Sequence, residues 1–274
     1  MSHIEHTTSL EAELEMRDIS KTYGDVTVLH GVSFAVRPGS VHALIGGNGS
    51  GKSTIAKIIA ASIPADSGGH IRVGAVEAAS DRWGHRERER ANVRIVHQDP
   101  CVFDVGTVAE NLAIADGFPT RAGSIAWGRL NKRAAEVLER FDIRTTPTTL
   151  VSDLAPAERT KLAIARALQD QADASSGLLI LDEPTAALPK REVEQLLAWT
   201  RAFASGERSI LFVSHHLDEI LGVADHLTAL RDGRVIETRS TSGLEESDLV
   251  ELITGKRFER GPARARGRRH GSGT

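Results

Sequence analysis

The fold of this chain is decided by the stretch Leu44-Ile45-Gly46-Gly47-Asn48-Gly49-Ser50-Gly51-Lys52-Ser53-Thr54. From Gly46 to Ser53 it matches G-x-x-x-x-G-K-[ST]. Residues 41–45 before it are an apolar run apart from His42, as in a buried strand, and residues 54–61 after it have the apolar spacing of a helix. In the order strand, loop, helix, the motif predicts a phosphate-binding loop. Loop and helix N–H groups then converge on one point and favour an anion there.

The residues of this loop predict how a nucleotide would bind. Glycines let the backbone approach a phosphate closely and adopt positive φ. Lys52 is expected to reach the β- and γ-phosphates, and the Ser53 hydroxyl is expected to ligate Mg²⁺. The alternative is a glycine-rich turn that matches by chance, and the lysine, the hydroxyl and both flanks argue against it.

Composition narrows the class of protein. The chain has 274 residues, 40% apolar and 26% charged, with a formal net charge of −3. These values are ordinary for a soluble globular protein and give no global attraction to nucleic acid or anionic lipid. There is no apolar run of 18 residues, and residues 1–8 do not resemble a signal peptide. Cys101 is the only cysteine, which excludes an internal disulfide and favours a role as a small filler. We expect a cytosolic protein that reaches a membrane only through a partner.

Near the N-terminus, alternating apolar and polar residues predict short antiparallel strands over residues 14–19, 26–29 and 32–36. The segment Tyr23-Gly24-Asp25 is expected to be a turn. Tyr23, the only tyrosine, is a candidate for stacking on an adenine ring, and a packing aromatic is the alternative reading.

The middle of the chain reads as a helical insertion. Thr107 and Glu110 have the spacing of a capping box. Apolar spacing predicts a helix over 131–141, and Ser152 or Asp153 is expected to cap another helix with Pro156 in its first turn. Further on, helices are predicted over 190–204 and 248–254, with a hairpin at Asp232-Gly233. The charged segment 81–90 is expected to be a solvated helix or loop.

Polar side chains follow three more apolar strands of the predicted sheet. Asp182 and Glu183 follow residues 178–181, His215 follows 210–213, and Gln98 follows 93–96. Ligands of parallel sheets bind at the carboxyl ends of the strands, so these groups are expected to meet the phosphate loop. Asp182 then suits Mg²⁺, Glu183 a water attacking the γ-phosphorus, and His215 the γ-phosphate itself. Together they predict a site that hydrolyses a nucleoside triphosphate.

At these residues the chain resembles the nucleotide-binding subunit of an ATP-binding cassette (ABC) transporter, from about Leu14 to Gly255. The resemblance implies a P-loop NTPase with a RecA-like α/β core, an antiparallel β subdomain and a helical subdomain over about 99–169. It implies ATP and Mg²⁺ as cofactors, with Ser53, Gln98 and Asp182 at the metal. The implied nucleotide-binding residues are Tyr23, Gly46, Gly47, Asn48, Gly49, Ser50, Gly51, Lys52, Ser53 and Thr54, and the implied catalytic residues are Glu183, His215 and Gln98.

Within that family, the segments around Gly46, Asp182 and His215 are most similar to sugar-import ATPases of the ribose, galactose and xylose type. Those usually carry two cassettes in one polypeptide, and this chain resembles the first. The implied partners are a second cassette, a transmembrane permease and, indirectly, a solute-binding protein, at the inner face of the cell membrane. No nucleic-acid partner is expected. Residues 1–13 and the arginine-rich residues 256–274 are expected to be a flexible end and a disordered tail or linker.

Two departures from the family pattern matter. The signature Leu-Ser-Gly-Gly-Gln aligns with Leu154-Ala155-Pro156-Ala157-Glu158, and the Ser-Ala-Leu-Asp pattern appears as Ala186-Ala187-Leu188-Pro189. Ala155 lacks the hydroxyl and Pro156 lacks the N–H that would meet a partner's γ-phosphate. The sequence therefore predicts pairing with a cassette whose signature is intact. A non-transport ABC ATPase acting on ribosomes or DNA, and a regulatory cassette with little hydrolysis, remain the alternatives.

Overall fold

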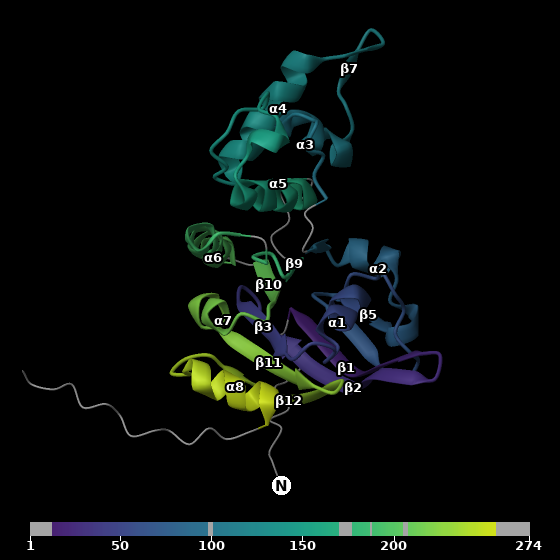
Figure 1. Ribbon diagram of the computed structural model, residues 1–274. Helices are drawn as coiled ribbons and strands as arrows, with labels where there is room; N and C mark the ends of the chain where they lie inside the picture. Colours follow the sequence, from purple (N-terminus) through teal and green to yellow (C-terminus); the bar gives the residue numbers. More distant parts are fainter. Residues whose placement is uncertain (1–12, 98–100, 170–176, 187, 205–207, 256–274) are drawn as a thin grey trace, which may run out of the picture.

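The computed structural model describes residues 13–97, 101–169, 177–186, 188–204 and 208–255, and Figure 1 shows how their elements are arranged. A body of two sheets with flanking helices lies below a lobe made of α3, α4 and α5. The predicted α/β class with a P-loop core is confirmed. The predictions for residues 1–12 and 256–274 lie outside the described residues.

The central sheet is six-stranded, in the order β12-β11-β3-β10-β9-β6, and is parallel except for β12. Its strands are β3 (Val41–Gly46), β6 (Val93–Val96), β9 (Gly177–Asp182), β10 (Arg208–Val213), β11 (His226–Arg231) and β12 (Arg234–Ser240). The apolar run in β9 is buried because both faces of the sheet are covered. Leu178 and Ile180 pack in a cluster with α1 (Lys52–Ile59) and the second sheet, while Leu179 and Leu181 pack in the cluster of the later helices.

The second sheet is antiparallel and four-stranded, in the order β2-β1-β4-β5. Its strands are β1 (Leu14–Tyr23), β2 (Val26–Val36), β4 (His70–Val73) and β5 (Val76–Ala79). The two strand segments predicted over 26–36 are one continuous strand, because β1 pairs along its whole length with register shifts that absorb the irregularities. Tyr23 ends β1, so the turn is Gly24–Asp25 only. The charged segment forms η1 (Ser80–Arg82) and α2 (His85–Arg90).

The upper lobe contains α3 (Val108–Asp116), α4 (Trp127–Arg140), η2 (Val151–Asp153) and α5 (Pro156–Leu168). The Thr107 capping box is confirmed, since its hydroxyl accepts from the Glu110 N–H at 3.2 Å and the Glu110 carboxylate accepts from the Thr107 N–H at 2.7 Å. The lobe is not wholly helical, because β7 (Thr120–Arg121) and β8 (Ser124–Ile125) form a small hairpin.

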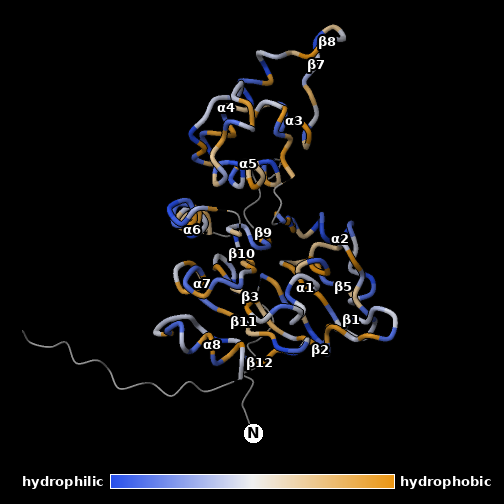
Figure 2. Tube along the Cα trace, viewed as in Figure 1, coloured by the Kyte–Doolittle hydropathy of each residue, from blue (hydrophilic) through white to orange (hydrophobic). Residues whose placement is uncertain are grey.

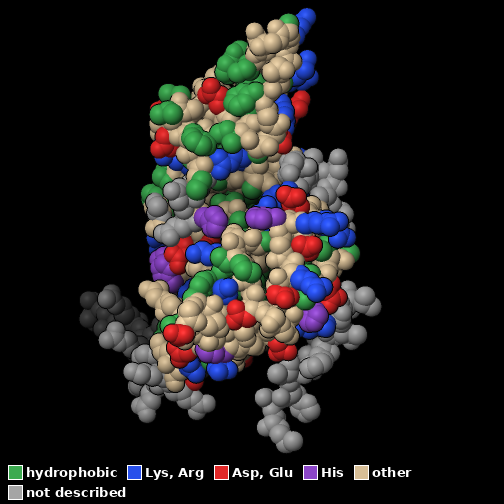
Figure 3. All heavy atoms as spheres, turned by 90° about the vertical axis from the view of Figure 1, so that its right-hand side faces the viewer, with side chains coloured by type: hydrophobic (Ala, Val, Ile, Leu, Met, Phe, Trp, Pro, Cys, Tyr) green, Lys and Arg blue, Asp and Glu red, His purple; other side chains and the backbone are tan. Residues whose placement is uncertain are grey.

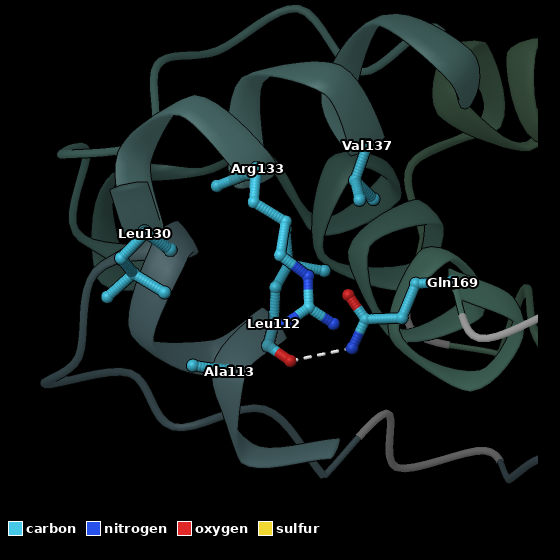
Figure 4. A pocket seen from close by; sticks show the side chains of 8 residues that line it. Leu112, Ala113, Leu130, Arg133, Val137 and Gln169 are labelled. Atoms are coloured by element: carbon cyan, nitrogen blue, oxygen red, sulfur yellow. Dashed lines mark hydrogen bonds between the residues drawn. The ribbon is translucent and has the colours of Figure 1, made fainter. Parts of the chain in front are cut away.

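The predicted cap of α5 was wrong. Ser152 and Asp153 lie in η2, and the N-cap residue is Ala155, with Pro156 at the first helical position. Leu154 is extended and separates η2 from the helix. The helix begins at Pro156, because the fixed φ and missing N–H of proline suit the first helical position. A small cavity between α3, α4 and the end of α5 is closed by Gln169, whose side-chain amide donates to the Leu112 carbonyl (Figure 4).

The remaining helices are α6 (Lys190–Ala204), α7 (Leu217–Val223) and α8 (Glu246–Thr254), which cover the face of the central sheet opposite α1. The predicted β11–β12 hairpin is confirmed, with Asp232 and Gly233 both at positive φ. Orange segments of the tube in Figure 2 run through the buried strands between these layers. Cys101 was expected to be a filler but is exposed. Among the described residues, no helix is long and apolar enough to cross a membrane.

Candidate functional site

The phosphate loop joins β3 to α1, and its shape requires glycine at two positions. Gly46 and Gly51 have φ of 154° and 103°, respectively. A Cβ at Gly46 would collide with the Leu230 carbonyl, and a Cβ at Gly51 would collide with the Leu29 side chain. Gly51 is the N-cap of α1, and no side chain caps that helix. The N–H groups at the start of α1 are therefore available to an anion.

Lys52 lies over this loop. Its Nζ donates to the Gly46 carbonyl at 2.8 Å and to the Gly47 carbonyl at 3.0 Å, and the side chain is buried. Burial lowers the pKa of Lys52, and the nearby carboxylates of Glu183 and Asp182 oppose that shift. An ammonium group held this way adds positive charge to the cradle formed by the loop.

One oxygen of the loop, Ser50 Oγ, and one beside it, Asp182 Oδ1, are buried and make no hydrogen bond within the described part of the chain. Burial raises the pKa of Asp182; the charges of His97, Lys57 and Lys52 oppose this, and that of Glu183 adds to it. Buried polar atoms normally have partners, so unmatched ones indicate a site shaped for a bound group. A carboxylate and hydroxyls beside an anion-binding loop fit a nucleotide phosphate with Mg²⁺.

Glu183 and His215 form a pair at the ends of the adjacent strands β9 and β10. His215 Nδ1 lies 3.1 Å from Glu183 Oε1, and their side chains are 45% and 26% exposed, respectively. A carboxylate only accepts, so the imidazole donates from Nδ1. Glu183 has φ of 50°, in the left-handed region, and its N–H donates to the Val213 carbonyl at 2.8 Å. This backbone turn ends β9 immediately after Asp182 and brings Glu183 to the end of β10.

Two further predicted site residues are Tyr23 and Gln98. Tyr23 ends β1 with 46% of its surface exposed, and Lys21 Nζ lies 5.2 Å from the centre of its ring. Leu29, on the strand paired with β1, packs against Gly51, so this hairpin adjoins the phosphate loop. Gln98 lies outside the described residues. The strand before it, β6, pairs in parallel with β9, with Val96 opposite Leu181, next to Asp182.

The degenerate signature lies at the start of α5. Ala155 caps the helix, Pro156 has no N–H, and Ala157 is buried. The Ala157 N–H donates to Glu192 Oε2 on α6 at 2.8 Å. Glu158 Oε1 accepts from Lys161 at 3.0 Å, while its Oε2 is buried and accepts from no group of the described chain. The N-terminus of α5 is therefore capped by a carboxylate of the same chain. Sequence reasoning missed Glu192, because its partner is 35 residues away in sequence and only helix packing brings the two together.

The phosphate loop and the strand-end carboxylates agree with the proteins that this chain is similar to. The family model for ABC transporters matches residues 29–186. This chain belongs to the ABC transporter family. It is 38% identical over 242 residues to ribose import ATP-binding protein RbsA 2 of Rubrobacter xylanophilus, covering 88% of this chain and 45% of that protein. It is 35% identical over 243 residues to ribose import ATP-binding protein RbsA of Rhodococcus jostii, covering 89% of this chain and 47% of that protein. The chain thus spans about half the length of these relatives.

Solved structures share the fold. The ADP conformation of MJ1267, an ATP-binding cassette of an ABC transporter, matches with a TM-score of 0.73 at 23% identity, covering 90% of this chain and 100% of that one. CbiO1 of Clostridium perfringens, part of the ABC transporter complex cbiONQ, matches with a TM-score of 0.71 at 23% identity, covering 88% and 93%. The ABC ATPase architecture predicted from the sequence is therefore confirmed.

Proposed function

We propose that this chain binds Mg-ATP and hydrolyses it as one cassette of a transporter ATPase, with residues 14–255 as the ATPase domain and about 99–169 as its helical subdomain. The observation that carries the proposal is the Glu183–His215 pair at the strand ends beside Asp182 and the phosphate loop. Bound Mg²⁺ would neutralise phosphate charge, held by Ser53 and Asp182 with Gln98. Tyr23 would stack on the adenine.

The chain's own residues then divide the chemistry. Lys52 and the N–H groups of residues 46–54 hold the β- and γ-phosphates. Glu183 orients the attacking water and accepts its proton. General-base catalysis of this kind accelerates a reaction by roughly 10²–10⁴. His215, hydrogen-bonded to Glu183 at 3.1 Å, orients that carboxylate and contacts the γ-phosphate.

We propose that hydrolysis drives uptake of a small solute, a sugar, through a separate permease at the inner face of the membrane. Support comes from the two relatives described as ribose import ATP-binding proteins. Further support comes from the large apolar side chains that are exposed on the upper lobe: Phe103, Val105, Ile114, Phe118, Ile125, Trp127 and Leu150. Figure 3 shows hydrophobic side chains at the surface of this lobe on the face that it draws. Exposed apolar patches of this kind mark protein interfaces.

We further propose that the ATP site is completed by a different cassette. The signature of this chain offers a partner's γ-phosphate no hydroxyl at Ala155 and no N–H at Pro156, and Glu192 already occupies the Ala157 N–H. A second carboxylate, Glu158, adds negative charge at the same helix start. A partner with an intact signature would close over this chain's phosphate loop.

The proposal is tested by purifying the chain and measuring Mg-ATP binding by calorimetry, then turnover and sugar uptake in vesicles carrying the permease and a second cassette. We expect binding by the chain alone and turnover only in the assembly. A chain that binds no Mg-ATP would refute the ATPase proposal. Turnover without sugar uptake, in the presence of the solute-binding protein, would refute the transport proposal.

A further inference from the structure

A buried carboxylate links the two loops that carry the Glu183–His215 pair. Glu219 lies on α7 with only 6% of its surface exposed. Its Oε2 accepts from the Thr185 hydroxyl at 2.7 Å and from the Ser214 hydroxyl at 3.1 Å. A buried carboxylate is costly unless it is hydrogen-bonded, so these two bonds define where both hydroxyls must lie.

The two donors are next to the proposed catalytic groups. Thr185 is two residues after Glu183, in the loop that follows β9, and Ser214 immediately precedes His215 after β10. Ser214 Oγ also accepts from the His216 N–H at 3.1 Å, which holds the start of the histidine loop. Thr185 and Ser214 are themselves buried, with 3% and 1% exposed. Glu219 therefore joins both loops through a buried carboxylate, in addition to the more exposed bond between His215 and Glu183.

Glu183 and His215 need such support. Their side chains are partly exposed, and Glu183 has a left-handed φ of 50°, a conformation that persists in a non-glycine residue only when its surroundings hold it. The backbone bond from the Glu183 N–H to the Val213 carbonyl fixes one end of its loop. The bond from Thr185 to Glu219 fixes the other end.

We propose that Glu219 is a positioning residue for ATP hydrolysis, which holds Glu183 and His215 at hydrogen-bonding distance without contacting the nucleotide. This inference rests on the proposed ATPase function. Both bonds use one oxygen, so the role needs a fixed acceptor at that point and not a negative charge. Misplacing a catalytic group by about 1 Å can cost roughly a hundredfold in rate.

The experiment compares Glu219→Leu, Glu219→Gln and the control Asp218→Asn, which removes an exposed carboxylate from the same helix. We expect turnover at saturating Mg-ATP in the assembled complex to fall roughly ten- to hundredfold in Glu219→Leu, with the dissociation constant for Mg-ATP within about twofold of wild type. Glu219→Gln keeps a carbonyl acceptor and should retain most turnover. Asp218→Asn should match wild type. In a Glu183→Gln background, Glu219→Leu should cause little further loss, since it acts through Glu183.

A second readout needs no activity. Nitrogen-15 NMR of histidine-labelled chain, with His215 assigned from a His215→Gln variant, should show the His215 imidazole resonances moved in Glu219→Leu and unmoved in Asp218→Asn. Wild-type turnover by Glu219→Leu, or unmoved His215 resonances in that folded variant, would overturn the inference. If the wild-type assembly hydrolyses no ATP, the proposed function fails, and the His215 resonances still decide whether Glu219 positions the pair.

Discussion

Two helices of this protein begin at places where a phosphate is expected in the family, and they differ in what their first turns leave free. The start of α1 follows Gly51, has no side-chain cap, and has the buried Lys52 beside it. The start of α5 has a proline, and its Ala157 N–H is bonded to Glu192. A helix N-terminus attracts an anion only while its donors are unpaired, so the first site is open and the second is filled by the protein itself.

The difference shows that the two helix starts of one cassette can differ in how many N–H donors they leave for a phosphate. A partner's γ-phosphate would have to displace the Glu192 carboxylate and approach Glu158, both negatively charged. Bonds to charged groups are worth about 1.5–3 kcal/mol each, so two missing donors are enough to weaken closure severely. The phosphate-loop half has no such defect.

Glu183→Gln should have the largest effect on the open half. Removing the carboxylate that we propose accepts the water's proton should lower ATP turnover in the assembled complex by about 10²–10⁴, while Mg-ATP binding persists. Steady-state turnover and calorimetry measure the two quantities, with Glu246→Gln, an exposed glutamate on α8, as the control. Turnover at the wild-type rate would remove Glu183 from the catalytic site.

Lys52→Ala should weaken ATP binding in the same half. Losing charge-assisted contacts at about 1.5–3 kcal/mol each should raise the dissociation constant roughly tenfold to more than a hundredfold. Lys132→Ala, an exposed lysine on α4, should leave it unchanged. Circular dichroism should verify folding, because Lys52 is buried and also holds the Gly46 and Gly47 carbonyls. An unchanged dissociation constant in folded protein would contradict the role of the loop.

Acid should destabilise the strand that carries the loop before it affects the lobe that carries the signature. Burial, with the charges of His226 and Arg37, lowers the pKa of His42 on β3 to about 3. The unfolded chain binds a proton there near pH 6.5 and the folded chain does not, so stability falls as pH drops below about 6.5. The expected loss from pH 7 to pH 5 is about 2 kcal/mol.

That loss is measured by denaturant unfolding at both pH values, comparing wild type with His42→Gln, which should lose less. Residues 101–169 contain no histidine. Hydrogen exchange should therefore rise first in β3 and β11 and later in α5. A pH dependence identical in the two proteins would contradict the role of His42.

Glu192→Gln should have the smallest effect, because a neutral amide oxygen still accepts the Ala157 N–H. Removing the negative charge should raise, by a few-fold at most, the affinity of this chain's signature for a partner's ATP-loaded phosphate loop. Glu194→Gln, exposed on the same helix, is the matched control. The affinity is measured by titrating labelled chain with ATP-loaded partner, and a weaker complex in Glu192→Gln would contradict electrostatic blocking.

The sequence predicted where the phosphate loop and the strand-end groups lie. It did not predict that the first turn of α5 is bonded to another side chain of the same chain. The phosphate loop is contiguous, and Asp182, Glu183 and His215 follow strongly apolar strands, so a local pattern and the parallel sheet were sufficient. The missing donors at Ala155 and Pro156 were also visible. The Glu192 cap and the bonds from Glu219 to Thr185 and Ser214 arise from how α6 and α7 pack, which no local pattern encodes.

Two smaller features, the β7–β8 hairpin and the start of α5, were also not predicted correctly from local sequence patterns. The hairpin β7–β8 has strands of two residues each, too short to give an alternating pattern. Ser152 and Asp153 looked like caps because of their residue type, but the chain forms a separate turn there before α5 begins.

We expect the phosphate loop of this chain to bind ATP and its signature segment, residues 154–158, to be unable to bind the ATP of a partner. ATP-dependent dimerisation of the chain tests this most directly. The Glu183→Gln chain, saturated with Mg-ATP and without any partner, is measured by light scattering. It is compared with the same chain carrying Ala155→Ser, Pro156→Gly, Ala157→Gly and Glu192→Ala. The account predicts a monomer for the first and an ATP-dependent dimer for the second. A stable ATP-dependent dimer of the first would contradict it.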